Sequence, residues 1–158
     1  MSVPTITAII LATIVAMELI AWAVHRYVMH GFGWAWHRSH HEPDDKHLEK
    51  NDLYAVIFGG LALLLILLGT GAASPLYWVG VGMSAYGLLY FLVHDGLVHQ
   101  RIPFPRKVRS AYLKRLVQAH RLHHAVKDRE GSVSYGFLYA PPVQKLRAKL
   151  REGADLRR

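Results

Sequence analysis

The chain contains no cysteine, and large parts of it contain no lysine or arginine. The missing thiol excludes disulfide scaffolds, iron–sulfur clusters, cysteine-ligated zinc and cysteine nucleophiles. The 11 histidines are therefore the leading candidates for any metal or redox chemistry. All 19 basic residues lie in Arg26–Lys50 and Arg101–Arg158, and no nucleic-acid recognition motif or dinucleotide-binding glycine motif accompanies them. We therefore expect no nucleic-acid partner.

The stretches without basic residues are long enough to cross a bilayer, whose hydrocarbon core takes about 20 helical residues. The first of them, Val3–Val24, is 22 residues long and carries one charge, Glu18. The other two, joined by a short uncharged turn, form a helical hairpin. These runs predict an all-α integral membrane helical bundle, a single domain over residues 1–158. The expected spans are about 3–24, 54–73 and 76–98.

The number of spans decides on which side of the membrane the rest of the chain lies. With three spans, residues 25–50 and 99–158 share one side, and they hold every lysine and arginine. The positive-inside rule makes this side cytoplasmic. We expect an inner-membrane protein with a cytoplasmic, histidine-rich helical cap. A soluble protein with buried apolar helices is the alternative.

Ten of the histidines follow a repeated pattern, which chance does not readily produce. Its order is H-x4-H, H-x2-HH, and then both patterns again: His25 and His30; His37, His40 and His41; His94 and His99; His120, His123 and His124. Each group follows a span or lies in a basic block, so all ten reach one membrane face. We expect them to be metal ligands. His47 lies outside the pattern, and we expect no role for it.

The spacing restricts how these rings share metal ions. Positions i, i+3 and i+4 lie on one helix face, so each H-x2-HH triplet can point three imidazoles at one place. Positions i and i+5 are about 140° apart on an ideal helix. Each H-x4-H pair therefore either straddles two metal ions or lies on a distorted helix. Ten rings suit two ions with about five imidazoles each, or four and an open position.

Carboxylates near the histidines are candidates to offset the charge of the ions and to orient the rings. Asp95 is adjacent to His94, and Glu18 lies seven residues before His25 on the same helix face. Either carboxylate could instead serve as a hydrogen-bond partner between helices. Imidazole binds zinc, copper, iron and nickel alike, so the ligand type leaves the metal open.

Beyond the histidines, the chain resembles a known family in its flanking segments. These are HRYVMHGFGWAWHRSHHEP (25–43), NDLYAV (51–56), YGLLYFLVHDGLVHQR (86–101), YLKRLVQAHRLHHAV (112–126) and GFLYAPP (136–142). Together they resemble the membrane-bound carotenoid hydroxylases of bacteria, within the fatty acid hydroxylase/sterol desaturase superfamily. Such enzymes are often described with four spans. A partly inserted stretch around Tyr135–Pro142 is the candidate for the fourth.

The resemblance implies a chemistry. The ten histidines would hold two non-haem iron ions that activate O2, and the reaction would hydroxylate C3 of β-ionone rings. β-Carotene from the bilayer would give β-cryptoxanthin and then zeaxanthin, and canthaxanthin would lead toward astaxanthin. Electrons would come from NAD(P)H through a ferredoxin and its reductase. Residues near the histidines are expected to shape the ring pocket, unless the tryptophans instead anchor the chain at the interface: Trp34, Trp36, Tyr90, Phe91, Gly31 and Gly33.

Two further readings are open. One is a sterol or fatty acyl hydroxylase or desaturase of the same superfamily. The other, from a different class, is a histidine-rich membrane metal transporter, which predicts histidines inside the spans or in a flexible tract. The fixed spacing at one membrane face favours the enzyme.

Overall fold

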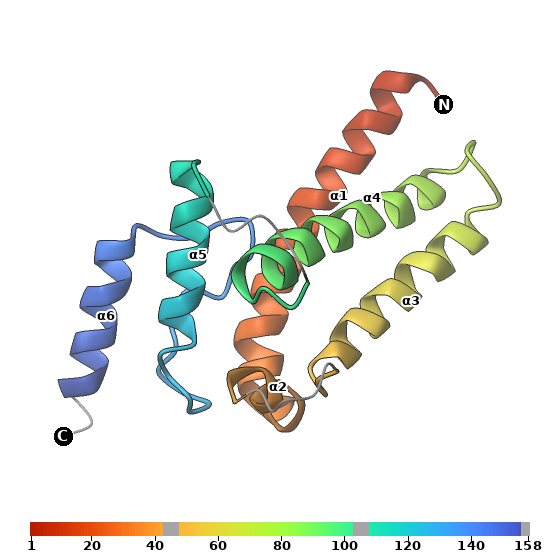
Figure 1. The fold of residues 1–158 in the computed structure, drawn as a ribbon. Helices are drawn as coiled ribbons and strands as arrows, with labels where there is room; N and C mark the ends of the chain where they lie inside the picture. Colours follow the sequence, from red (N-terminus) through yellow and green to blue (C-terminus); the bar gives the residue numbers. More distant parts are fainter. Residues whose placement is uncertain (43–47, 103–107, 156–158) are drawn as a thin grey trace.

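The computed structural model describes residues 1–42, 48–102 and 108–155, and within them every regular element is a helix. Along the chain (Figure 1) these are α1 (Val3–Ala23), the π-helix η1 (Val24–Phe32), α2 (Trp34–His41), α3 (Asp52–Leu68), α4 (Pro75–Tyr90), the π-helix η2 (Phe91–Val98), α5 (Ala111–His123) and α6 (Val143–Asp155). The predicted all-α class is confirmed.

Three of the helices begin at a serine. The side chains of Ser2, Ser74 and Ser110 each accept a hydrogen bond from a backbone N–H in the first turn of α1, α4 and α5. In this way a side chain satisfies one of the donors that the first turn leaves unpaired. Pro4 and Pro75 stand at the start of α1 and α4, where a missing N–H costs nothing. Local sequence therefore sets these starting points.

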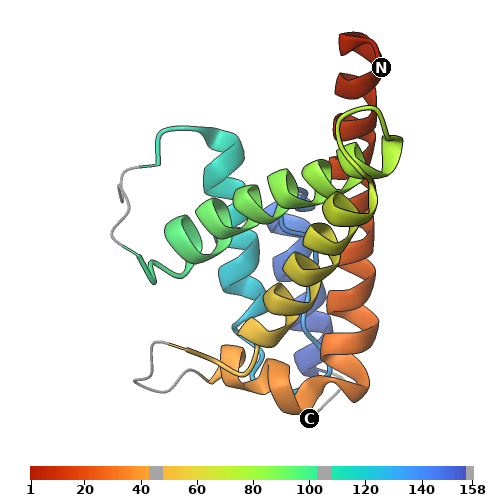
Figure 2. The same cartoon turned by 90° about the vertical axis from the view of Figure 1, so that its right-hand side faces the viewer.

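Helix α4 lies between α1 and α3 (Figures 1 and 2), and two glycines allow the close packing. A Cβ atom on Gly80 would lie 2.7 Å from the carbonyl oxygen of Ala62 in α3, and one on Gly82 would lie 2.7 Å from the Cβ of Thr13 in α1. Small residues of this kind are typical of helix interfaces in membranes.

The outer surfaces of these helices are apolar. Leu11, Val15 and Leu19 of α1 are each about 60% exposed, at 58%, 63% and 64%. Two continuous helices, Val3–Phe32 and Pro75–Val98, are long and apolar enough to cross a membrane. Their exposed apolar side chains require lipid rather than water. Membrane association is therefore supported, and the buried apolar helices of a soluble protein are not what the structure shows.

Helix α3 is shorter than the span expected there. It is an apolar helix of 17 residues that ends at Leu68, whereas the predicted span continues to residue 73. At 1.5 Å per residue it is about 25 Å long, slightly less than the hydrocarbon thickness. The three-span topology therefore stays a prediction.

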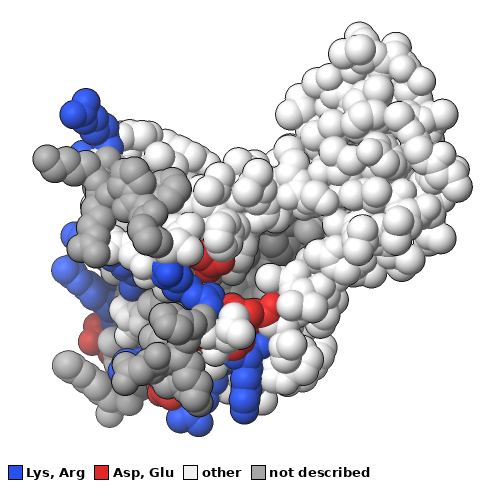
Figure 3. Space-filling model, turned by 45° about the vertical axis from the view of Figure 1, so that its right-hand side comes forward, with Lys and Arg blue, Asp and Glu red and all other residues white. Residues whose placement is uncertain are grey.

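Among the described residues, most charged side chains gather at one end of the molecule. In Figure 3 lysine, arginine and acidic side chains gather at that end, and the arm formed by the other end is without charge. The charged end contains α5 and α6, which share a small core with the segment between them: Leu116, Ala119, Val133, Ala140 and Leu146. Residues 135–142 of this segment have no helical structure, so the expected fourth span is not formed as a helix.

Candidate metal centre

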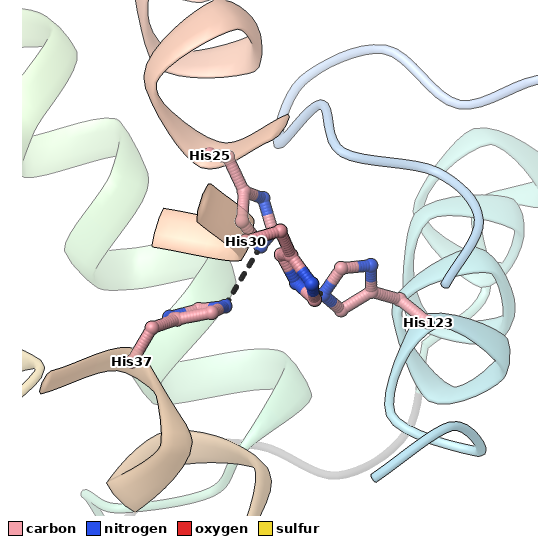
Figure 4. Close-up of side chains that lie close together, drawn as sticks. All are labelled: His25, His30, His37 and His123. Atoms are coloured by element: carbon pink, nitrogen blue, oxygen red, sulfur yellow. Dashed lines mark hydrogen bonds between the residues drawn. The ribbon is translucent and has the colours of Figure 1, made fainter. Parts of the chain in front are cut away.

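The rings of ten histidines, carried by η1, α2, η2 and α5 and by the residues that end η2 and α5, meet in one region. Two groups of four have their ligand-capable nitrogens within 4.8 Å of one another. The His25 cluster consists of His25, His30, His37 and His123 (Figure 4), and the His94 cluster consists of His40, His94, His99 and His120. His41 and His124 lie between them, with their rings stacked at 4.4 Å. His47, expected to play no part, lies outside the described residues.

Both H-x4-H pairs lie on π-helical turns. His99 N–H donates to the carbonyl oxygen of His94 at 2.9 Å, an i→i+5 bond that spans the second pair. Because such a turn closes over five residues, positions five apart come to one side of the helix. His25 and His30 thus fall in one cluster, as do His94 and His99. Of the two alternatives for these pairs, the distorted helix is found, and the pairs do not straddle the two sites.

The H-x2-HH triplets behave in the opposite way, and the expectation that each points three rings at one place is wrong. His37 belongs to the His25 cluster and His40 to the His94 cluster. The second triplet divides likewise, with His123 in the first cluster and His120 in the second. Helices α2 and α5 therefore run along the boundary between the sites, and each supplies rings to both.

The two remaining rings attach one to each cluster. The Nε2 atom of His41 lies 3.1 Å from that of His123, and the Nε2 atom of His124 lies 2.9 Å from that of His120. One further ring thus approaches each group of four. The arrangement is compatible with both predicted alternatives, two metal ions with about five imidazoles each or with four and an open position.

The protonation pattern of the rings fits a metal. The Nδ1 atoms of His30 and His123 lie 2.7 and 2.9 Å from the carbonyl oxygens of Arg129 and Val133. A carbonyl oxygen only accepts, so each Nδ1 carries the proton and each Nε2 presents a lone pair. These two Nε2 atoms are nevertheless only 3.1 Å apart. Two lone pairs so close repel each other unless a cation lies against them.

The two carboxylates expected to orient the rings differ in their contacts. Asp95 Oδ1 accepts a hydrogen bond from Nδ1 of His94 at 2.9 Å, as expected. Glu18 instead accepts from the hydroxyl of Tyr86 and from three successive backbone N–H groups of residues 137–139. Glu18 of α1 therefore links this helix to Tyr86 of α4 and to the loop at residues 137–139. This is the alternative role predicted for it, that of a hydrogen-bond partner.

The rings are buried, and burial keeps them neutral. Removal from water is the main cause that lowers the pKa of His37 to about 3, of His41 to about 4 and of His124 to about 3. Only the neutral imidazole has a free lone pair, so at neutral pH these rings are ready to bind a metal.

The same shifts predict loss of metal in acid. Below pH 6.5 the unfolded chain takes up protons on these histidines, whereas the folded chain does not until about pH 4 to 3. Stability therefore falls as the pH drops through this range, because the unfolded state binds more protons. We expect metal content, measured after dialysis, to decline together with the folded fraction measured by circular dichroism. Metal retained fully at pH 3 would contradict a site made of histidines.

The loop after α5 presents backbone carbonyl oxygens to four of the rings, those of His25, His30, His41 and His123. Val133 and Tyr135 present their carbonyl oxygens to His123 and His25, at 2.9 and 2.8 Å. Ser134 between them has a φ of 62°, in the left-handed region. A residue other than glycine in this region costs conformational free energy, which the surrounding structure must offset. Ser134 lies between the two residues whose carbonyl oxygens accept hydrogen bonds from His123 and His25.

A cavity of about 390 Å³ adjoins the clusters, between α1, α3 and α4. Most of its lining is apolar, and two aromatic rings separate it from the histidines. Tyr90 stacks on His94 with ring centres 4.5 Å apart, and Phe137 stacks on His25 at 5.3 Å. The cavity therefore ends at Tyr90 and Phe137, each of which stacks on a histidine of a different cluster.

Two of the residues expected to shape a ring pocket line this cavity. Tyr90 and Phe91 contribute to it, whereas Trp34, Trp36, Gly31 and Gly33 do not. Sequence reasoning missed several partners of the rings, among them Asn51, whose Oδ1 lies 2.7 Å from Nδ1 of His37. The segment NDLYAV, singled out for its resemblance, was the signal that could have identified it.

Comparisons with known proteins agree with this geometry. The fatty acid hydroxylase family model matches residues 10–141. A protein of Pantoea ananas named beta-carotene hydroxylase is 61% identical over 144 residues, which cover 91% of this chain and 82% of that protein. One of Paracoccus sp. (strain PC1), with the same name, is 55% identical and covers 94% of this chain and 93% of its own length. No solved structure matches the chain.

Proposed function

Because this chain belongs to the fatty acid hydroxylase family, we propose that it is a β-carotene 3-hydroxylase. It takes one end of the carotenoid from the bilayer and inserts one oxygen atom from O2 at C3 of the β-ionone ring. β-Carotene becomes β-cryptoxanthin, and a second reaction on the other ring gives zeaxanthin. Canthaxanthin, converted in the same way, leads toward astaxanthin. The bacterial relatives named beta-carotene hydroxylase support this assignment.

The apolar cavity is the observation that carries the proposal. It lies in the helices that contact lipid and ends at Tyr90 and Phe137, which stack on a ring of each cluster. An apolar ring held there is kept from water and lies beside both sites. The residues of the cavity thus bind and orient the ring, and Tyr90 and Phe137 lie between it and the histidines.

The ten histidines would hold two iron ions, which supply the O2 activation that attack on an unactivated C–H bond requires. Their buried, neutral rings provide the donors, and Nδ1 partners fix which nitrogen faces each site. Zinc binds the same ligands but has no redox chemistry. The family's oxygen-dependent hydroxylation therefore favours iron.

Electrons reach the site from the charged end of the molecule. We assign this end to the cytoplasmic side of the inner membrane, because it holds the described lysines and arginines (Figure 3). A ferredoxin, reduced by NAD(P)H through its reductase, is the donor we propose. The positive surface suits a small acidic redox protein.

Expression in a bacterium that accumulates β-carotene tests the function. We expect the pigment to be converted to β-cryptoxanthin and zeaxanthin, as measured by chromatography. The chain with His40→Ala, made in the same host, is the inactive control. Unchanged β-carotene, with the intact protein present in the membrane and reductant available, would contradict the proposed substrate.

The mouth of the cavity offers a test of substrate size. Gly59 and Gly87 are exposed and line the cavity, and a Cβ atom on either would meet no other atom within 4 Å. Leucine at Gly87 therefore fits the helix but projects into the cavity. We expect Gly87→Leu to lower β-carotene turnover at least about 10-fold, a typical cost when a pocket loses the room for its substrate.

Gly60 provides the matched control. Like Gly87 it lies in a helix and a Cβ atom added to it would meet no other atom within 4 Å, but it does not line the cavity. Gly60→Leu should keep its activity, and both variants should keep their metal content, measured by elemental analysis. Equal turnover by the two variants would show that the ring does not enter through this cavity.

A further inference from the structure

The two histidine clusters differ in what their rings hydrogen-bond to. In the His25 cluster the Nδ1 partners are neutral: the carbonyl oxygens of residues 129, 133 and 135 and the amide oxygen of Asn51. In the His94 cluster two of the partners are carboxylates. Glu49 Oε2 accepts from His40 at 2.8 Å and Asp95 Oδ1 accepts from His94 at 2.9 Å.

We propose that the two metal sites are unequal, and that the His94 cluster binds its ion more tightly because Glu49 and Asp95 support its ligands. This inference rests on the metal centre of the proposed function. A carboxylate that accepts the Nδ1 proton raises the basicity of the imidazole and holds it in one orientation. It also places a negative charge near a divalent cation whose other ligands are neutral.

Burial strengthens this effect. The side chains of His40 and Glu49 are only 2% and 9% exposed, and that of Asp95 is 15% exposed. Charges act over longer distances where water is excluded. A site surrounded by neutral imidazoles and neutral acceptors, such as the His25 cluster, has no such compensation from its Nδ1 partners.

The Arg101–Asp52 ion pair and backbone hydrogen bonds hold the two residues, Glu49 and Asp95, in place. The guanidinium of Arg101 donates to both oxygens of Asp52, at 2.8 and 2.7 Å, and the backbone N–H of Arg101 donates to the carbonyl of Asp95. Asp52 in turn accepts from the backbone N–H of Glu49 at 2.9 Å. Arg101 also lies 3.6 Å from Asp95 Oδ1 and offsets part of its charge.

The His25 cluster contains a position at which the difference can be reversed. Asn51 is buried, and its Oδ1 accepts from Nδ1 of His37. Aspartate has nearly the same size and shape, and its oxygen can accept the same bond. Asn51→Asp would give the His25 cluster the carboxylate that it lacks.

Half-site variants of the full chain in detergent isolate the two sites. His30→Ala damages the His25 cluster and His99→Ala damages the His94 cluster, and each removes the second ring of an H-x4-H pair. Co²⁺ is the probe, because its absorption spectrum reports ligand binding, and a competing chelator gives its affinity. We expect His30→Ala, with the His94 cluster intact, to bind Co²⁺ at least about 10-fold more tightly than His99→Ala.

Substitutions of the acceptors then assign the cause. In the His30→Ala chain, Asp95→Asn or Glu49→Gln should weaken Co²⁺ binding about 10- to 100-fold. In the His99→Ala chain, Asn51→Asp should strengthen it, a gain that misfolding cannot produce. Equal affinities of the two half-sites, or no change with any acceptor substitution, would overturn the proposal. No carotenoid is present in this assay, so its outcome is independent of whether β-carotene is the substrate.

Discussion

Replacing His123 or His40 by alanine is expected to abolish hydroxylation. His123 is completely buried, and its Nε2 atom lies 3.1 Å from those of both His30 and His41. The Nε2 atom of His40 lies 3.1 Å from that of His94. Each variant thus loses a ring from a different cluster. Pigment analysis should show only β-carotene, and the ratio of metal to protein should fall by about one ion per chain.

His47→Ala is the control for these two variants. It removes a histidine outside the repeated pattern, so we expect substantial activity and an unchanged metal content. Full activity of His123→Ala or His40→Ala would remove the ligand assignment. Loss of activity in His47→Ala would mean that an eleventh histidine takes part.

Replacing Glu18 by glutamine is expected to disturb the metal centre from a distance. One oxygen of Glu18 lies 3.0 Å from each backbone nitrogen of residues 137–139, and the other lies 2.8 Å from the hydroxyl of Tyr86. Glu18 is half-buried, and a charged acceptor contributes more than a neutral one. We expect a loss of stability on the order of 2 kcal/mol, which is typical for hydrogen bonds to a charged group.

The loop that Glu18 holds also carries Phe137 and the carbonyl of Tyr135 that orients His25. Glu18→Gln should therefore lower both the midpoint of thermal unfolding and the activity. It should also change the Co²⁺ spectrum of the chain, which a loss of stability alone would not alter. Glu152→Gln, an exposed change on α6, is the control. An unchanged Co²⁺ spectrum in Glu18→Gln would separate the loop from the metal centre.

Spacing along the sequence predicts which residues meet, but only part of how they meet. The helices and the common end of the histidines follow from apolar runs and from helix periodicity, and the distortion at the H-x4-H pairs was one of two alternatives that periodicity left open. The division of each triplet does not, because it depends on where α2 and α5 lie relative to both sites. The sequence shows which residues share a face of a helix, but it does not show where that helix lies relative to the two sites.

The acceptors behind the rings were harder still to predict. The groups that orient His30 and His123 are backbone carbonyls, of Arg129 and Val133. Every residue has such a carbonyl, so no side chain marks these positions in the sequence. Asp95 could be predicted because it is adjacent to His94 in the sequence. Glu49 lies beyond the end of α2, the helix that carries His40, so helix periodicity does not relate the two residues.

The clusters have a further consequence for a chain that has no cysteine. His30 and His123 meet although 93 positions separate them, and His40 and His94 meet across 54. An ion in each site closes these long loops, as a disulfide does in a secreted protein, and disfavours the unfolded chain. The last third of the chain would then be held to the first helix by metal ligation. The supply of the metal would thus govern how much of this protein completes its folding, in addition to its turnover.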